Sequence, residues 1–324
     1  MKKNNYQGCI LNQTPEQEAR NYSQREFVSS PATVNWTEKK QENWNRYPIR
    51  NQDGSSSCVA MTMSKELSII FQQKYGKYIE FSSAFTYQNR NNLASLGCTS
   101  IDLYSVFPKL GNIYESFMPS QNMSESQIMA VKEESWFKDL AKVHSIKRIA
   151  LPLDFETVAS TVQQTGKGVM IWVSFSASEW TNTPKVSNKP ITSGHSICVT
   201  DYTLVDGKKY LVVDDSWGLN QAMNGQRLIS EEYFSARCFL ASYLMAFTLG
   251  ETKLIERPSY DGTIISLQKC LQFDGVFPMN VPFYESIGPI TTSAIIKFQK
   301  KYKINPPLGY FGPLTTAKII ELFP

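Results

Sequence analysis

The sequence predicts an α+β protein that carries a small helical domain at its C-terminal end. Three observations support this prediction. Apolar residues recur at helical spacing in the first half of the chain, and short runs of β-branched and aromatic residues mark the second half. After about residue 258, a sequence repeat with a helical period begins. Helices followed by strands are typical of an α+β domain, and the repeat indicates a separate unit.

The 324 residues, 42% hydrophobic and 19% charged, have the composition of a globular protein of one to three domains. We expect a polar N-terminal arm over 1–30, a globular domain over 31–250, a linker over 251–258 and a second domain over 259–324. The net charge of +4 is too small to favour a nucleic-acid partner. No segment approaches the ~20 apolar residues of a membrane span. The arm lacks the apolar core of a secretory signal peptide.

The six cysteines are scattered and form no CxxC pair, so we expect no zinc site, no other metal and no cofactor. Isolated cysteines in a domain of this size are usually buried thiols. We apply that interpretation to all of them except Cys58. The cysteines are Cys9, Cys58, Cys98, Cys198, Cys238 and Cys270.

The most periodic helix of the first half follows Cys58. A run of serines, 55–57, precedes it as candidate helix caps, so Cys58 would lie in the first turn. Further helices are expected near 101–111 and 124–143. The apolar positions of the first helix are Val59, Met63, Leu67, Ile70 and Phe71.

Strands are expected in the second half over 168–175, 195–202 and 209–215. The turn 205–208, centred on Asp-Gly, favours a hairpin between the last two. In the C-terminal part, 288–298 matches 312–322 at an offset of 24 residues. Each copy has a Gly-Pro turn, a threonine as N-cap candidate and an apolar helix face. With a preceding helix near 264–272, the repeat predicts a three-helix unit.

Cysteine chemistry is the function that this pattern favours. A thiol attacks a carbonyl as its thiolate, and an ordinary cysteine ionises only near pH ~8.5. The start of a helix and a neighbouring imidazolium both stabilise the thiolate. The chain has only two histidines. His144 lies in a basic stretch that we expect at an exposed edge, whereas His195 follows a Ser-Gly turn and opens a strand. His195 is therefore the candidate base for Cys58.

Three further residues complete the candidate site. Asp215 ends the strand after that of His195, and in a hairpin it would lie beside the imidazole and orient it. Trp217 could then cover the His–Asp contact. Gln52, six residues before Cys58, could offer its side-chain amide to an oxyanion, with the Cys58 backbone N–H as the second donor. Each residue alone is more simply explained by core packing or turn chemistry. Their order and their neighbours favour catalysis.

Those neighbours make residues 31–250 resemble the papain family of cysteine peptidases. The resemblance implies a two-lobed fold, one lobe helical and one β-barrel-like, with the site between the lobes. By position it makes Cys58 the nucleophile, His195 the acid and base, Asp215 the ring orienter and Gln52 the oxyanion donor. The matching runs are 48–52 (PIRNQ), 57–60 (SCVA), 80–83 (EFSS), 113–119 (IYESFMP), 194–197 (GHSI) and 215–218 (DSWG).

The chain departs from the family pattern at several points. The family carries asparagine where this chain has Asp215. Ser55 stands where a cysteine usually bonds to one at the place of Cys98, which fits a fold built without that disulfide. Thr99 and Ser100 stand where a glycine pair binds the substrate backbone, so we expect substrate contact there with altered subsite geometry. The 30-residue arm is too short for the family's inhibitory prosegment.

The C-terminal part, 259–324, resembles the peptidoglycan-binding domain type 1, which implies peptidoglycan as a partner. Such modules also serve as attachment domains or pro-domains, and their aromatic residues can be plain core. The matching residues are Leu267, Gln268, 274–278, Gly288, Pro289, Thr291, Ala294, 297–299, 309–313 and Thr315.

Together these resemblances predict a bacterial or phage cysteine endopeptidase that cleaves proteins or peptides through a Cys58 thioester. Its C-terminal module would hold it at the cell wall. Without a signal peptide, it would be made in the cytoplasm and act at the wall after lysis or non-Sec release, or as part of a virion. Two alternatives stay open. One is a catalytically silent papain-fold protein used for wall binding or virion structure. The other is an intracellular peptidase whose last domain only stabilises the fold.

Overall fold

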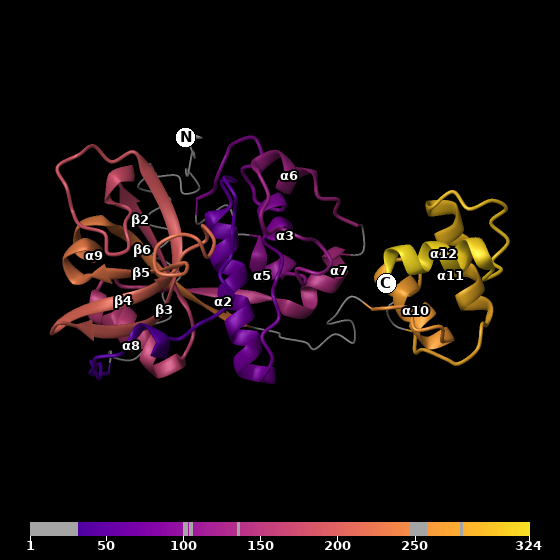
Figure 1. Ribbon diagram of the computed structural model, residues 1–324, viewed down its shortest axis with the longest axis horizontal. Helices are drawn as coiled ribbons and strands as arrows, with labels where there is room; N and C mark the ends of the chain where they lie inside the picture. The colour runs from indigo at the N-terminus through magenta and orange to yellow at the C-terminus, as the bar shows by residue number, and fades with distance from the viewer. Residues whose placement is uncertain (1–31, 100–102, 104–105, 135–136, 247–257, 279–280) are drawn as a thin grey trace. The chain divides into compact units, whose positions relative to one another are not determined.

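The computed structural model describes residues 32–99, 103, 106–134, 137–246, 258–278 and 281–324. The arm 1–30 and all but the last residue of the expected linker lie outside these described residues. The chain forms two compact units, one of 1–133 with 137–250 and one of 134–136 with 251–324 (Figure 1). None of the helices in the described part is long and apolar enough to cross a membrane.

The described part of the first unit begins with a segment that packs on the sheet, where Glu38 pairs with Leu204 and Trp44 contacts Val212 and Leu228. The helical lobe follows this segment. The expected helix over 124–143 is wrong as one element, because Val131 adopts an extended conformation (ψ 125°) and ends the first piece. The expected helix over 101–111 is described only over its last turn. The described elements are η1 (Gln41–Asn43), α2 (Cys58–Tyr75), α3 (Ser83–Gln88), α5 (Phe107–Leu110), α6 (Glu125–Ala130), α7 (Phe137–Ala141) and η2 (Lys142–His144).

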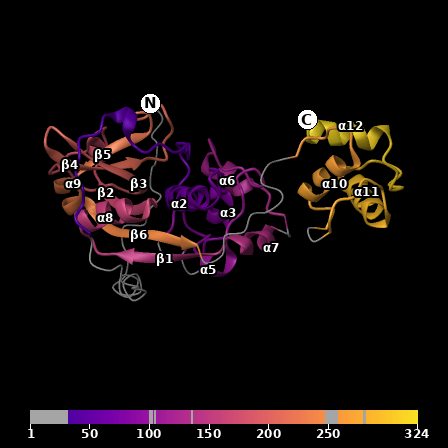
Figure 2. The ribbon, with the colours of Figure 1, turned by 90° about the horizontal axis from the view of Figure 1, so that it is seen from below.

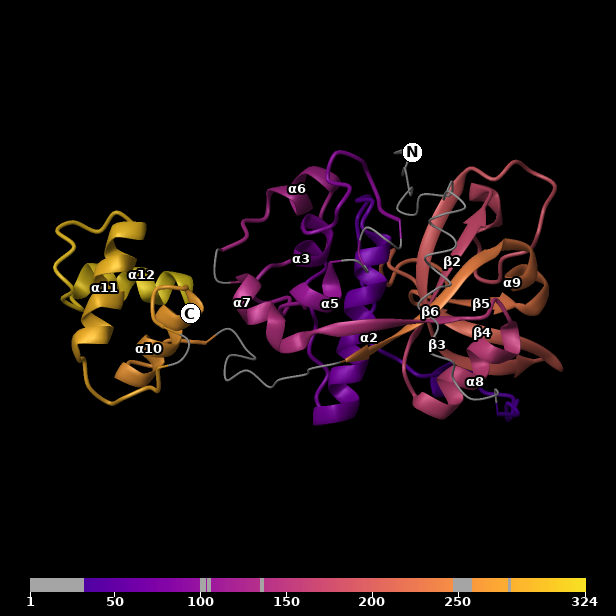
Figure 3. The same ribbon diagram turned by 180° about the vertical axis from the view of Figure 1, so that it is seen from behind.

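Helix α2 is the central element of this unit. It begins at Cys58 and is buried through Phe71, because it lies between the other helices and the sheet in every view (Figures 1, 2 and 3). Gly76, at a left-handed φ of 71°, ends it. The serines expected as caps do not cap it: Ser57 is the N-cap residue, but its hydroxyl contacts the Ser55 hydroxyl (2.7 Å) instead of a helix N–H.

The second lobe is built on one six-stranded antiparallel sheet of order β1-β6-β2-β3-β4-β5. The expected β3–β4 hairpin is present, and positive φ at Asp206 (49°) and Gly207 (71°) matches the type I′ turn that Asp-Gly favours. The strands are β1 (Ile146–Leu151), β2 (Val169–Phe175), β3 (Ser193–Val205), β4 (Lys208–Asp214), β5 (Gln226–Ser230) and β6 (Cys238–Ala246).

Helices cover the sheet on both sides, so most residues of the central strands β2 and β3 are buried on either face. α8 (Phe155–Thr165) and α9 (Glu231–Arg237) pack their apolar residues onto β2 to β5, and α2 contacts β3 and β6. A short turn of helix, η3 (Ala177–Glu179), lies in the loop between β2 and β3. The sheet is therefore enclosed, and its strands β3 and β6 lie directly against α2.

The expectation that His144 lies at an exposed edge is wrong. It is 1% exposed, and its ring packs 5.0 Å from Phe81, 5.1 Å from Tyr114 and 6.0 Å from Phe71. Burial in this aromatic cluster lowers its pKa from 6.5 to about 4. His144 is thus a neutral core residue of the helical lobe. The expectation of exposure rested on the basic residues near it in the sequence, which do not determine whether the histidine itself is buried.

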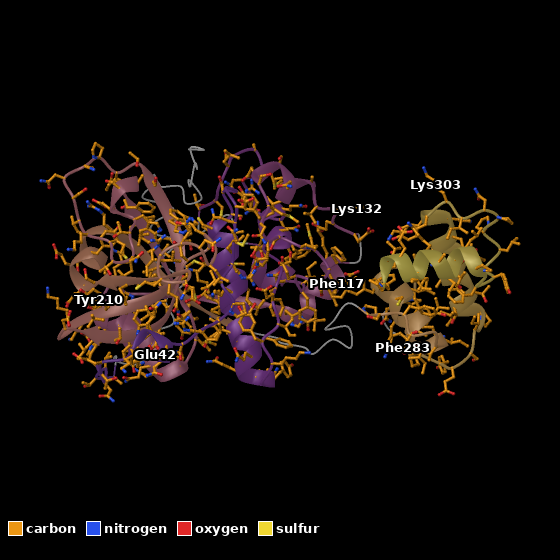
Figure 4. All side chains as sticks on the ribbon, viewed as in Figure 1. Glu42, Phe117, Lys132, Tyr210, Phe283 and Lys303 are labelled. Carbon is orange, nitrogen blue, oxygen red and sulfur yellow. The ribbon has the colours of Figure 1, made fainter. Side chains whose placement is uncertain are left out.

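The second unit contains three described helices, α10 (Ile264–Phe273), α11 (Pro289–Lys301) and α12 (Pro313–Leu322). Phe283, labelled in Figure 4, packs against the core that they form. The core residues are Leu267, Cys270, Leu271, Phe277, Ala294, Ile295, Phe298, Ile319 and Phe323.

The threonines of the repeat do not cap their helices as expected. Glycines are the N-cap residues of α11 and α12, with proline next, so the Gly-Pro turn alone starts each helix. The threonine hydroxyls of both copies instead accept hydrogen bonds from buried glutamines. Gln268 donates to Thr291 and Gln299 to Thr315, each over 2.9 Å. These motif residues hold the fold of the unit together.

Candidate active site

Cys58 is fully buried at the first residue of α2, where the N–H groups of the first turn have no partner within the helix and the positive end of the dipole lies. The Thr62 hydroxyl, one turn later, lies 3.0 Å from the carbonyl oxygen of Cys58 and 3.0 Å from that of Ser196. Ser196 follows His195 on β3. The threonine therefore joins the first turn of the helix to the strand that carries the histidine.

His195 and Asp215 are in direct contact. His195 is the third residue of β3, and Asp215 comes immediately after β4 rather than within it. Hairpin pairing brings His195 Nε2 to 2.7 Å from Asp215 Oδ1, with both side chains fully buried. Because Nε2 is held by the carboxylate, Nδ1 is the ring nitrogen left for Cys58. The Trp217 ring lies 5.0 Å from the imidazole and tilts 36° to it, so it packs beside His195 as expected of a shielding residue, whose effect on water stays a prediction.

The charges of these groups favour an imidazolium. Burial alone would lower the pKa of His195, but the carboxylate of Asp215 and then the thiol group of Cys58 raise it from 6.5 to about 9. Burial likewise opposes ionisation of Asp215, yet His195 and Arg227 lower its pKa to about 2. At neutral pH, Asp215 is therefore a carboxylate and His195 carries a proton on each ring nitrogen.

Two residues of the site were missed at the level of sequence. Arg227 Nε donates to Asp215 Oδ2 over 2.7 Å, and Trp180 Nε1 donates to the same oxygen over 3.0 Å. The Ser216 backbone N–H donates to Oδ1 over 2.7 Å. With His195, the carboxylate thus has four donors. The one available signal was an aspartate at a position where the papain family, by the resemblance described above, carries an asparagine, since a buried carboxylate needs a cation.

Gln52 joins the two lobes beside the site. Its side chain is fully buried: Oε1 accepts from the Ser216 hydroxyl (2.6 Å), and Nε2 donates to the Ser55 carbonyl (2.5 Å). Its backbone N–H also donates to the Ser216 carbonyl, over 2.8 Å. Nε2 carries two hydrogens, and Ser55 takes one of them. The amide is therefore held in one orientation with a second N–H group to offer.

A relay of hydrogen bonds supports the loop that precedes Cys58. Glu125 Oε2 accepts from the Ser56 backbone N–H (2.7 Å), and Oε1 accepts from the Tyr87 hydroxyl (2.8 Å). The Tyr87 oxygen in turn accepts from the Gly97 N–H (3.0 Å). The relay links the segments around residues 55 and 98. By the resemblance described above, members of the papain family usually join these two segments by a disulfide. Hydrogen bonds thus connect the two segments.

The expected substrate-binding pair is described only in part. Thr99 is buried, with 6% exposure, and Ser100 lies outside the described residues. Within the ranges that the structure describes, no group of three or more His, Cys, Asp or Glu side chains could hold a metal ion.

No protein-family model and no curated protein matches this sequence. Solved structures do. The chain has the papain-like fold. Xylellain, a cysteine protease from Xylella fastidiosa, is similar with a TM-score of 0.56 and 15% identity, over 76% of this chain and 97% of that one. Digestive procathepsin L 3 from the larval midgut of Tenebrio molitor gives 0.51 and 16%, over 70% and 78%.

A third similar structure contains the cysteine protease and lectin-like domains of Cwp84, a surface layer associated protein of Clostridium difficile. Its TM-score is 0.52 at 15% identity, over 68% of this chain and 55% of that one. At such identities the likeness is one of fold. The expected two-lobed α+β architecture is confirmed, and the chemistry has to be argued from the site itself.

The relay predicts that Glu125→Ala loosens the loop before Cys58. Ser56 and Tyr87 would each lose an acceptor, and an unsatisfied buried polar group costs about 1–3 kcal/mol. We expect faster amide hydrogen exchange over 54–60, measured by mass spectrometry. Ser126→Ala, at an exposed position on the same helix, is the control. Equal exchange in the two variants would mean that the relay does not support the loop.

Proposed function

We propose that the protein is a cysteine endopeptidase. The observation that supports this most strongly is the position of His195. Its ring is fully buried, its Nε2 lies 2.7 Å from Asp215 Oδ1, and Cys58 raises its pKa. An imidazolium beside a cysteine at a helix start stabilises a thiolate, which is the nucleophile of such enzymes. The papain-like fold raises the expectation further by analogy.

In the first half of the reaction, the Cys58 thiolate attacks the carbonyl carbon of the scissile peptide bond. The Cys58 backbone N–H and the second N–H of Gln52 Nε2 stabilise the oxyanion that forms. His195 gives its Nδ1 proton to the departing amine, since Nε2 stays bonded to Asp215. The C–N bond breaks, and the acyl half of the substrate remains on Cys58 as a thioester.

In the second half, neutral His195 takes a proton from water at Nδ1, and the resulting hydroxide attacks the thioester carbonyl. The C–S bond breaks, which releases the acid product and the thiolate. The ring keeps the proton that it took from water, so the pair of thiolate and imidazolium is restored. Asp215 keeps the ring in one orientation throughout, because its carboxylate accepts from Nε2–H in both protonation states.

This mechanism predicts that Cys58 is far more reactive than the other thiols. At neutral pH, iodoacetamide should modify Cys58 at least roughly tenfold faster than Cys198 and Cys238, whose pKa burial raises. Mass spectrometry of the alkylated peptides measures the rates. Cys58→Ala should abolish cleavage of a denatured protein mixture. Equal alkylation rates, with no cleavage by the native chain, would favour the catalytically silent alternative.

We propose further that the C-terminal unit binds peptidoglycan and so places the peptidase at the cell wall. The support is the resemblance of 259–324 and an open groove beside α12, which Lys303 lines together with several apolar side chains. An ammonium group beside apolar surface suits a peptide that carries carboxylates. The groove is lined by Tyr302, Lys303, Ile304, Asn305, Leu314, Ala317, Lys318 and Glu321.

Wall binding is tested by co-sedimentation with purified peptidoglycan. We expect the full chain to be retained, a chain ending at residue 250 to be lost, and Lys303→Glu to weaken retention by roughly tenfold. Lys297→Glu makes the same charge change at an exposed position of α11 outside the groove and should behave as the native chain does. Equal retention of full and shortened chains would contradict a targeting role.

A further inference from the structure

Asp215 lies between two cations inside the protein. His195 Nε2 is 2.7 Å from one carboxylate oxygen, and Arg227 Nε is 2.7 Å from the other. The three side chains are 0%, 0% and 3% exposed for His195, Asp215 and Arg227. At such burial, water screens these charges little, so each cation changes how strongly the carboxylate holds the other.

Arg227 is held rigidly in this position. It lies on β5 opposite Val213 of β4, two residues before Asp215. Its guanidinium lies 5.0 Å from the Trp180 ring and 5.4 Å from the Trp217 ring, and its Nη1 donates to the Thr181 carbonyl over 2.8 Å. A guanidinium fixed by strand pairing, ring contacts and a backbone carbonyl is preorganised toward Asp215.

We propose that Arg227 is a positioning residue for the reaction: it shares the charge of Asp215, so that the carboxylate orients His195 as a neutral amide would. The inference rests on the proposed peptidase function. His195 has to give up its proton when the amine departs, and a buried carboxylate with no other cation would hold that proton too firmly. Arg227 acts on the ring only through Asp215.

The charged groups that act on His195 are Asp215, from the end of β4, and Cys58, from α2. Arg227 acts on Asp215 from β5, and lowers its pKa together with His195. Removing Arg227 leaves His195 as the one strong cationic partner in this set, so the ring would bind its proton more tightly. Asp215→Asn would instead leave Arg227 buried without its counter-ion. Removing both charges restores a neutral arrangement.

The test is a double-mutant cycle of Arg227→Met, Asp215→Asn and the double variant. The chain contains only two histidines, so NMR of histidine-labelled protein follows His195 directly, with His144 as an internal reference. We expect Arg227→Met to raise the titration midpoint of His195 by about one unit or more, and to lower kcat roughly tenfold with little change in KM. The double variant should be more active than Asp215→Asn alone.

Arg227→Lys is the matched control, because it keeps the charge and should leave the His195 midpoint near its native value. If Arg227→Met does not fold, Asp215→Asn and the double variant still decide the matter. An unchanged His195 midpoint in Arg227→Met, or a double variant no better than the poorer single one, would overturn the proposal. If the native chain cleaves no peptide, the peptidase function fails, and the His195 midpoint still tests the role of Arg227.

Discussion

The buried contact between His195 and Asp215 is the interaction on which the rest of the site depends. A carboxylate without access to water is strongly destabilising unless hydrogen bonds and a cation replace the lost solvation. Here the replacement comes from four directions: the imidazole, a backbone N–H, the Trp180 indole and the Arg227 guanidinium. The pairing of β3, β4 and β5 brings the imidazole and the guanidinium to Asp215, and the β2–β3 loop adds the indole.

The nucleophile reaches this pair from the other lobe, through contacts that leave little freedom. Thr62 links the first turn of α2 to the strand of His195, and Gln52 links the loop before Cys58 to Ser216, beside Asp215. Glu125 also holds this loop, because it accepts from the Ser56 backbone N–H and from the Tyr87 hydroxyl. The geometry between thiol and imidazole is therefore set by several hydrogen bonds between lobes, each worth on the order of 1 kcal/mol.

Much of this could be predicted from sequence because the signals are local. The serine run and the helical period placed Cys58 at a helix start, and an Asp-Gly turn predicted the hairpin that joins His195 to Asp215. Arg227 and Trp180 were not predicted as site residues, because their approach to Asp215 depends on the pairing of β4 with β5 and on the path of the β2–β3 loop. His144 was misjudged because charged neighbours in sequence can point outward while the residue between them is buried. The substrate-binding pair was placed from resemblance alone, and Ser100 lies outside the described residues.

We expect Cys58 and His195 to form an ion pair, which the ultraviolet absorbance of the Cys58 thiolate reports. The measurement is the difference between the native chain and Cys58→Ala as pH rises, repeated in a His195→Gln background. With the ion pair present, the thiolate absorbance should appear at a pH well below ~8.5, the pKa of an ordinary thiol. Replacing His195 should remove the absorbance at that low pH. A signal that appears only as the pH rises through ~8.5, with or without His195, would contradict the account.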